Sequence, residues 1–251
     1  MTSKSINRVP QIIFLYWVIK IASTTLGETG ADMFSMTFNL GYGETIIIFM
    51  ILFLMLLVYK LALKKYNPAA YWLLFTASAI VGTGISDFID RTLGLGYALG
   101  SFVLVVLLLV ILKLWYQKER SVSVENITTT PAEIYYWLAF LIANTLGTAA
   151  GDFMSDGLHL GFLISALLIT TMLLITVLLH FYTKTSKILL FWIAFVLTRP
   201  FGATFGDLLT KPIAKGGLNL GTIGASIFFT VMLIIGLLKE TKLEKVRNQI
   251  E

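Results

Sequence analysis

Long apolar segments alternate with short polar connections along the whole chain. A transmembrane helix needs roughly 20 predominantly apolar residues, and eight segments meet this test. They run over about 11–36, 40–63, 69–90, 94–116, 132–155, 160–182, 187–211 and 219–238. The pattern predicts an all-α integral membrane protein, with residues 1–251 forming a single transmembrane domain of eight helices. The first segment carries Lys20, Glu28 and Asp32 and lacks a small-residue cleavage pattern, so we expect a retained helix rather than a signal peptide.

An aromatic residue followed by tryptophan recurs four times, near the start of every second apolar segment. The pairs are Tyr16-Trp17, Tyr71-Trp72, Tyr136-Trp137 and Phe191-Trp192. Ten residues after each tryptophan comes a glycine, and fifteen after it an aspartate, without a gap in any copy. The glycines are Gly27, Gly82, Gly147 and Gly202, and the aspartates are Asp32, Asp87, Asp152 and Asp207. This self-similarity predicts four tandem copies of one two-helix unit.

The copies start 55, 65 and 55 residues apart, which also divides the chain into two similar halves offset by 120 residues. The predicted repeats are about 11–65, 66–120, 131–185 and 186–240, and the halves are about 1–120 and 131–251. Because each unit has an even number of spans, all four copies enter the membrane in the same direction. We therefore expect same-direction pseudo-symmetry about the membrane normal, rather than the inverted repeats of many transporters.

The run Thr-Thr-Leu-Gly-Glu-Thr-Gly-Ala-Asp at 24–32, with its weaker echoes in the other copies, carries a family resemblance. It resembles the repeat of an uncharacterised bacterial family of membrane proteins that contain four copies of a two-helix repeat of unknown function. The resemblance covers nearly the whole chain and implies a prokaryotic inner-membrane protein. It implies no activity.

The two helices of each unit differ in their polar content. The second, even-numbered helices are apolar all round and can face lipid. The first, odd-numbered helices place polar residues three or four apart, which puts them along one stripe of each helix. A charged side chain facing hydrocarbon costs about 2.5–3.5 kcal/mol. We therefore expect the odd helices to form an inner ring with their stripes facing one another, and the even helices to form an outer ring.

Charge is distributed unevenly between the two predicted sides of the membrane. The chain is 57% hydrophobic and 13% charged, with a net charge of +5. Fourteen of the lysines and arginines fall on the side of the termini and three, Arg91, Lys211 and Lys215, on the other. This bias predicts cytoplasmic termini and a basic surface that meets anionic lipid headgroups, and it leaves no need for a nucleic-acid partner. The absence of cysteine excludes disulfides and thiolate metal sites.

The polar stripes bring acidic residues to a single predicted depth, in the outer half of the membrane. The acids are Glu28, Asp32, Asp87, Asp90, Asp152, Asp156 and Asp207, and the bases near them are Arg91, Arg199 and Lys211. Seven acids against three bases leave about four negative charges if all are ionised, which protons or a cation must balance. Oxygen ligands suit hard or borderline cations such as Mg²⁺, Ca²⁺ or Mn²⁺.

We therefore expect an ion-binding layer with no covalently attached cofactor. The expected ion-binding residues are Asp32, Asp87, Asp152, Asp207, Glu28, Asn144, Thr24 and Thr148. The expected metal ligands are the four repeated aspartates. The expected proton or charge relay comprises Glu28, Asp90, Asp156, Arg199 and Lys211. The competing interpretation is structural, in which the aspartates cap helix ends and satisfy short turns.

The function expected from this layer is transport of a small cation, a divalent metal such as manganese, with possible coupling to protons. One alternative is a carrier of a small organic or anionic substrate held by Arg199 and Lys211, with the carboxylates as proton relays. Another is a membrane scaffold without transport. A membrane enzyme is disfavoured, because the chain has no nucleophile-base pair, histidine cluster or phosphate loop.

Four smaller predictions concern single residue types. The tryptophans are expected to form an interfacial belt, and the repeated glycines to permit close helix packing. Lys20 is expected to extend toward the cytoplasmic interface. His159, which stands where two other copies have Asn39 and Asn219, is expected in a cap or turn.

Overall fold

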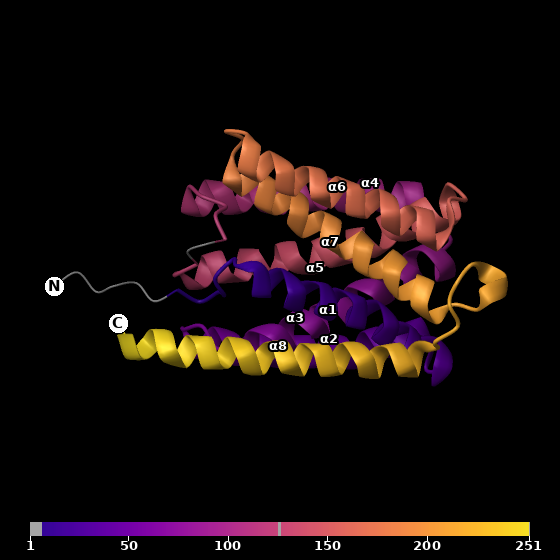
Figure 1. Ribbon diagram of the computed structural model, residues 1–251, viewed down its shortest axis with the longest axis horizontal. Helices are drawn as coiled ribbons and strands as arrows, with labels where there is room; N and C mark the ends of the chain where they lie inside the picture. The colour runs from indigo at the N-terminus through magenta and orange to yellow at the C-terminus, as the bar shows by residue number, and fades with distance from the viewer. Residues whose placement is uncertain (1–6, 125–126, 251) are drawn as a thin grey trace.

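The computed structural model describes residues 7–124 and 127–250 and shows a bundle of long helices running along one direction (Figure 1). Over these residues the chain forms eight α-helices and no β-strand. They are α1 (Phe14–Asp32), α2 (Gly41–Leu63), α3 (Pro68–Asp87), α4 (Tyr97–Glu119), α5 (Thr130–Asp152), α6 (Gly161–Tyr182), α7 (Lys187–Thr210) and α8 (Thr222–Ile250). Both ends of the described chain lie at the same end of the bundle, here called the terminal end (Figure 1).

A five-residue π-helical turn follows the repeated aspartate in the first three copies. These turns are η1 (Met33–Thr37), η2 (Phe88–Thr92) and η3 (Phe153–Gly157). The fourth copy instead ends α7 before Pro212 and adds a short 3-10 helix, η4 (Ile213–Lys215), because proline has no N–H to continue the helix. In three copies a left-handed residue, Asn39, His159 or Asn219, with φ of 55° to 58°, precedes the next even-numbered helix, and the second copy has Gly94 with φ of 67° at this position. His159 therefore has the turn role expected of it.

The odd-numbered helices form a closed inner ring. Helix α1 contacts α3, α3 contacts α5, α5 contacts α7, and α7 returns to α1. The even-numbered helices lie outside this ring, and each packs mainly on the odd helix of the following copy. Thus α2 lies on α3, α4 on α5 and α6 on α7, while α8 closes the outer ring on α1. The arrangement agrees with polar stripes that face inward.

The repeated glycines lie where neighbouring inner helices approach most closely. A Cβ added to Gly27 would lie 2.5 Å from Cβ of Ala79, and one added to Gly82 would lie 2.8 Å from Cβ of Asn144. The same contact recurs between Gly147 and Arg199 and between Gly202 and Thr24. In every copy the partner is the residue seven positions after the next tryptophan, in cyclic order. The expectation that these glycines permit close packing is confirmed, since the helices continue through them.

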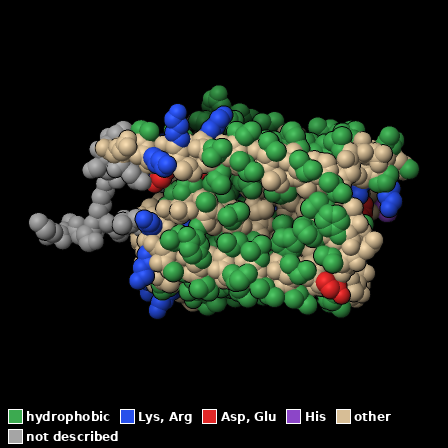
Figure 2. All heavy atoms as spheres, turned by 90° about the horizontal axis from the view of Figure 1, so that it is seen from below, with side chains coloured by type: hydrophobic (Ala, Val, Ile, Leu, Met, Phe, Trp, Pro, Cys, Tyr) green, Lys and Arg blue, Asp and Glu red, His purple; other side chains and the backbone are tan. Residues whose placement is uncertain are grey.

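Apolar side chains cover much of the face shown in Figure 2, and on this face Lys and Arg gather mainly near the terminal end. Six helices among the described residues are long and apolar enough to cross a membrane, namely α2, α3 with η2, α4, α6, α7 and α8. Helix α1, which carries Lys20, Glu28 and Asp32, and α5 are not among them. The chain is thus a helical, multi-pass membrane protein with four internal repeats.

Three of the four repeated tryptophans do not lie in the expected interfacial belt, and only Trp17 is partly exposed. Trp72 and Trp137 are at most 1% exposed, and Trp192 is 8% exposed. Their rings pack inward against tyrosine and phenylalanine side chains, for example Trp137 against Tyr71 with ring centroids 5.2 Å apart. The prediction was wrong for Trp72, Trp137 and Trp192, because a position near the start of a helix does not determine which way a ring points, and these rings pack inside the bundle.

Two basic residues counted on the terminal-end surface are buried instead. Glu133, at the start of α5, binds Arg8 (Oε2 to Nη1, 3.0 Å) and Lys60 (Oε1 to Nζ, 2.6 Å). None of the three side chains is more than 9% exposed. The segment around Arg8 also bonds through its backbone N–H to the Ile127 carbonyl. Arg8 and Lys60 therefore bind Glu133 within this end of the bundle and do not contribute to its exposed basic surface.

Candidate ion-binding layer

The four repeated aspartates lie at one level of the inner ring, here called the aspartate layer. Asp32, Asp87 and Asp152 end α1, α3 and α5, and Asp207 lies in the last turn of α7. All four are 1% or 2% exposed. The repeat explains this placement, because the same fifteen-residue offset ends on the same helix face in each copy.

Two bases join the aspartates into two pairs. Lys211 Nζ lies 2.6 Å from Asp32 Oδ2 and 3.1 Å from Asp207 Oδ1. Arg91 binds Asp87 (Nε to Oδ1, 3.3 Å) and Asp152 (Nη2 to Oδ2, 3.2 Å). Arg91 and Lys211 hold equivalent positions, four residues after the aspartates of the second and fourth copies. Arg91 and Lys211 are 120 residues apart, which is the offset between the two halves of the chain. The aspartate layer therefore has the same twofold relation as the two halves.

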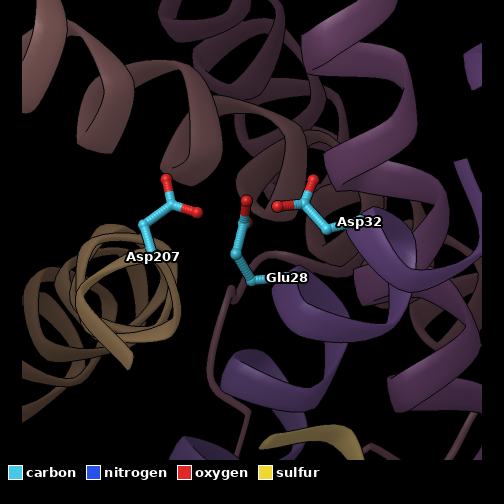
Figure 3. Close-up of side chains that lie close together, drawn as sticks. All are labelled: Glu28, Asp32 and Asp207. Atoms are coloured by element: carbon cyan, nitrogen blue, oxygen red, sulfur yellow. The ribbon is translucent and has the colours of Figure 1, made fainter. Parts of the chain in front are cut away.

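Glu28 brings a fifth carboxylate beside one of these pairs. Oxygens of Glu28, Asp32 and Asp207 all lie within 4.8 Å of one another, and all three residues are buried. Figure 3 shows Glu28 between the two aspartates, with the three carboxylates directed toward a common space. Asp87 and Asp152 do not belong to this group. The four aspartates thus do not come together as a single set of metal ligands, while three carboxylates on α1 and α7 do.

Threonines and Arg199 hold Glu28 in place. Thr83 and Thr148 donate to Oε2 of Glu28 over 3.2 and 3.3 Å. These two threonines occupy the position of Glu28 in the second and third copies, eleven residues after the tryptophan. Arg199 Nη1 lies 3.7 Å from the same oxygen. The groups that contact Glu28 thus come from α3, α5 and α7, the other three helices of the inner ring.

Arg199 is itself buried and bound largely by backbone oxygens. Its Nη1 donates to the Thr24 carbonyl at 2.9 Å, and its Nη2 donates to the Ala79 carbonyl at 3.1 Å and to the hydroxyl of Thr83. The side chain is 1% exposed. Pro200 follows it inside α7. These acceptors hold the guanidinium in one orientation. Arg199 is therefore a fixed positive charge on the terminal-end side of Glu28.

Lys20 does not extend to the cytoplasmic interface, and this expectation was wrong. Its side chain is 0% exposed and lies in the inner ring, where Nζ donates to the Phe195 carbonyl at 2.9 Å and to the Thr198 hydroxyl. Nζ also lies 3.9 Å from the ring centroid of Phe195 and 5.6 Å from that of Phe75. Among the described residues no carboxylate forms an ion pair with Lys20.

The repeat gives the reason why Lys20 faces inward. It stands three residues after its tryptophan, where the other copies have Phe75, Phe140 and Phe195. The Phe140 ring contacts both of the others, with centroids 5.4 Å from Phe75 and 4.1 Å from Phe195. We call these four positions the phenylalanine layer. The spacing of polar residues within one helix does not predict that Lys20 faces inward. Alignment of the four copies predicts it, because Lys20 stands where the other copies have phenylalanine.

Tyrosines close the inner ring beyond the phenylalanine layer, toward the terminal end. Tyr16, Tyr71 and Tyr136 are at most 1% exposed. The hydroxyls of Tyr71 and Tyr136 lie 2.5 Å apart, and Phe191 packs against Tyr16 with centroids 6.5 Å apart. At the opposite end, Lys211 and Arg91 keep 15% and 28% of their side chains exposed. The aspartate layer is therefore nearer to solvent from the end opposite the termini.

The remaining predicted site residues divide into two groups. Asn144 lies inside the ring and donates to the Ser78 hydroxyl at 2.9 Å, and Thr24 supplies a carbonyl to Arg199. Asp90 points instead toward α4, with Oδ1 close to Gly100, and Asp156 is exposed. The last two do not join the buried carboxylates, so the structure gives no contact that would place them in a relay.

The inner ring holds nearly balanced charge once all its layers are counted. Five buried carboxylates, Glu28 and the four aspartates, face Arg91, Lys211, Arg199 and the deeper Lys20. If all ionise, one negative charge remains, rather than the four expected from seven acids and three bases. Most of the negative charge of the buried carboxylates is therefore neutralised within the protein. The remaining negative charge lies around Glu28, Asp32 and Asp207.

The profile of one protein family matches the chain four times. The family is described as a Repeat of Unknown Function (DUF347), and the matched residues are 15–66, 70–121, 135–186 and 190–244. No protein in the curated set and no solved structure matches the chain. The four matches begin 55, 65 and 55 residues apart, as the tryptophans do. Because these matches span most of the sequence, the chain belongs to the family of membrane proteins built from this repeat of unknown function.

Proposed function

We propose that the protein transports a small cation across the membrane, and that Glu28, Asp32 and Asp207 bind it. The observation that carries this proposal is the buried group of three carboxylates whose oxygens lie within 4.8 Å of one another. Buried ionisable residues within a membrane are functional by default, and several carboxylate oxygens suit a divalent ion such as Mg²⁺ or Mn²⁺. Manganese is the substrate we would test first.

Lys211 would compete with a bound cation for the carboxylates of the proposed site. Its ammonium contacts both Asp32 and Asp207, so it already supplies a positive charge between two of the three carboxylates. A divalent cation that enters the group replaces this ammonium as their partner and displaces Lys211 toward the outer end. Protons bound by Glu28 or the aspartates balance the charge when the cation leaves. Proton-coupled transport follows from this competition.

The proposed topology is eight transmembrane helices with cytoplasmic termini, in a prokaryotic inner membrane. Helices α1 and α5 lie in the closed ring among apolar neighbours and have 19 and 23 residues, which corresponds to about 28 and 34 Å of helix. Reporter fusions at 66, 122 and 185 should report cytoplasm, and fusions near 38, 92, 157 and 214 the outer side. A cytoplasmic signal from 157 would contradict eight spans.

A second candidate is a carrier of a small organic or anionic substrate. One observation favours it: the aspartates are at most 2% exposed, whereas Arg91 and Lys211 keep 28% and 15% of their side chains exposed. A molecule approaching from the outer end meets these two bases before any carboxylate. In this case the carboxylates would carry protons, and Arg91 and Lys211 would bind the substrate.

Reconstituted protein separates the two candidates. Purified protein in liposomes is assayed for uptake of radiolabelled Mn²⁺, with a pH-sensitive dye inside the vesicles. We expect Asp32→Asn and Asp207→Asn to abolish uptake and Glu28→Gln to reduce the proton signal. Asp156→Asn is the matched control, since it removes an exposed carboxylate four residues after Asp152 and should leave uptake unchanged.

The pairing of the aspartates makes the test sharper. Asp87→Asn and Asp152→Asn alter the pair bound by Arg91 and should weaken uptake less than Asp32→Asn. Normal uptake by correctly folded Asp32→Asn and Asp207→Asn variants would overturn the cation site. Loss of function in Arg91→Gln and Lys211→Gln, with uptake of an organic anion by the wild type, would favour the second candidate.

A further inference from the structure

An apolar groove opens on the side of the bundle between α1, α6 and α7. It has a volume of about 460 Å³ and is lined by Trp17 and Ile21 of α1, Leu173 and Val177 of α6, and Ala194 and Thr198 of α7. That volume is within the roughly 300–1,000 Å³ range of small-molecule sites. The groove lies outside the inner ring and shares no residue with the candidate ion-binding layer.

The groove is left uncovered because α8 is held toward the opposite side of α1. Glu240 of α8 accepts hydrogen bonds from the Tyr66 hydroxyl and from Nε1 of Trp72, both at 2.5 Å. These bonds tie α8 to the start of α3, and α8 has only a few contacts with α7. Figure 1 shows α8 on the side of the bundle away from α6. The α1–α7 seam therefore has no outer helix over it near the terminal end.

The two ends of the groove differ in chemistry. Near the terminal end His180 and Lys187 line it, and both side chains are exposed. Lys187 forms no ion pair with any described residue. The other end reaches Thr198, whose hydroxyl binds the buried ammonium of Lys20. An occupant thus meets positive charge at the membrane surface and an apolar wall below it.

The length of the groove identifies the kind of molecule that fits. From Lys187 to Thr198 the chain rises eleven residues along α7, or about 16 Å. One leaflet is half of a hydrocarbon core of about 30 Å, so the groove is as long as one leaflet is thick. We propose that it binds an anionic phospholipid of the leaflet at the terminal end, with one acyl chain in the groove and its headgroup at Lys187 and His180.

The position of Trp17 makes this proposal measurable. Trp17 lines the groove and is only partly buried, whereas Trp72, Trp115, Trp137 and Trp192 are at most 8% exposed. Protein in liposomes that contain a small fraction of phosphatidylglycerol with brominated acyl chains should lose Trp17 fluorescence. Brominated phosphatidylcholine at the same fraction should quench about fivefold less, since one basic residue contributes about 1 kcal/mol with anionic lipid. A Trp17→Phe variant should lose the quenching by both lipids.

Two further variants separate a specific site from ordinary lipid contact. Lys187→Gln together with His180→Gln should reduce the preference for phosphatidylglycerol, while Lys113→Gln, an exposed base on α4 at the same end, should not. Ala194→Phe should fill the groove and reduce quenching by both lipids. Equal quenching by the two lipids in the wild type, or a preference unaffected by Lys187→Gln and His180→Gln, would overturn the proposal. The inference requires only that the chain lies in a bilayer, so it stands or falls independently of cation transport.

Discussion

The repeated glycines and the charged layers on either side of them follow different rules. At Gly27, Gly82, Gly147 and Gly202 the four copies make the same contact with the next inner helix. One residue after this glycine position only the first copy has a glutamate, and three residues before it only the fourth has an arginine. The difference shows that the repeat builds the scaffold and the aspartate layer from equivalent parts, while Glu28 and Arg199 each come from a single copy. Variants of both regions can test this division.

The largest effect is expected from Arg199→Met. It leaves the Glu28 carboxylate buried without its cationic neighbour, and breaking a buried charge pair costs about 3–5 kcal/mol. The double variant Glu28→Gln, Arg199→Met should recover most of this loss, because no uncompensated charge remains. Chemical unfolding in detergent micelles measures both. A double variant no more stable than Arg199→Met alone would mean that Arg199 stabilises the fold through its backbone acceptors instead.

The next largest effect is expected from Gly147→Ala. The added Cβ would lie 2.1 Å from Cγ of Arg199, and such overpacking costs about 1–3 kcal/mol. Gly224→Ala in α8 is the matched control, since its Cβ meets no atom within 4 Å and alanine favours a helix. Thermal unfolding should place Gly147→Ala below the wild type and Gly224→Ala at or above it. Equal unfolding temperatures would show that the inner helices can separate without penalty.

A smaller loss is expected from Tyr66→Phe, which tests the attachment of α8. Burial, and then the nearby Glu240 carboxylate, raise the pKa of Tyr66 above its ordinary value. The hydroxyl therefore keeps its proton and donates to Glu240, and its removal should cost about 1.5 kcal/mol. Because a raised tyrosine pKa favours the protonated form, this contribution is present below the unfolded pKa of about 10 and is lost only above it.

The difference between wild type and Tyr66→Phe should accordingly stay constant from pH 6 to pH 9. Tyr59→Phe removes an exposed hydroxyl of α2 and should have no effect. Unfolding curves across this pH range make the comparison. A difference that decreases between pH 6 and pH 9 would contradict the assignment of the stabilisation to the Tyr66 proton.

The smallest change, of opposite sign, is expected from Lys20→Met. A buried ammonium without an ion-pair partner loses its hydration, so an apolar side chain should stabilise the phenylalanine layer by about 1 kcal/mol. Lys113→Met, on the exposed face of α4, should leave stability unchanged. A fold that gains stability while uptake falls would assign the lysine to transport. A strongly destabilised Lys20→Met variant would show that its hydrogen bonds to Phe195 and Thr198 hold the helices together.

Much of the scaffold could be predicted from sequence, because a gap-free repeat places equivalent residues at equivalent depths. The glycine contacts and the inward direction of Asp32 and its equivalents follow from that rule. The packing of each even helix on the following copy does not, since apolar helices carry no signal for a particular neighbour. The π-helical turns after the aspartates also lack a distinct sequence pattern.

The candidate site was less predictable for two physical reasons. Whether Lys211 binds only Asp207 on its own helix or also Asp32 on α1 depends on the distance between helices, which spacing along one chain does not contain. Lys20 was assigned to the interface because a long lysine near a helix end usually reaches water. Lys20 instead lies between the rings of Phe75 and Phe195. Comparison of the four repeats predicts this position, whereas the pattern along α1 alone does not.

The packing of even helices on the following copy makes the two halves of the chain interlock. Helix α4 of the first half covers α5 of the second, and α8 of the second half covers α1 of the first. Each half thus covers one inner helix of the other half, as in a domain-swapped dimer whose two subunits have been joined into one polypeptide. Neither half alone can cover both of its own inner helices. Two separately synthesised halves would therefore be expected to assemble with each other, and a shorter ancestral chain of two repeats to exist only as a pair.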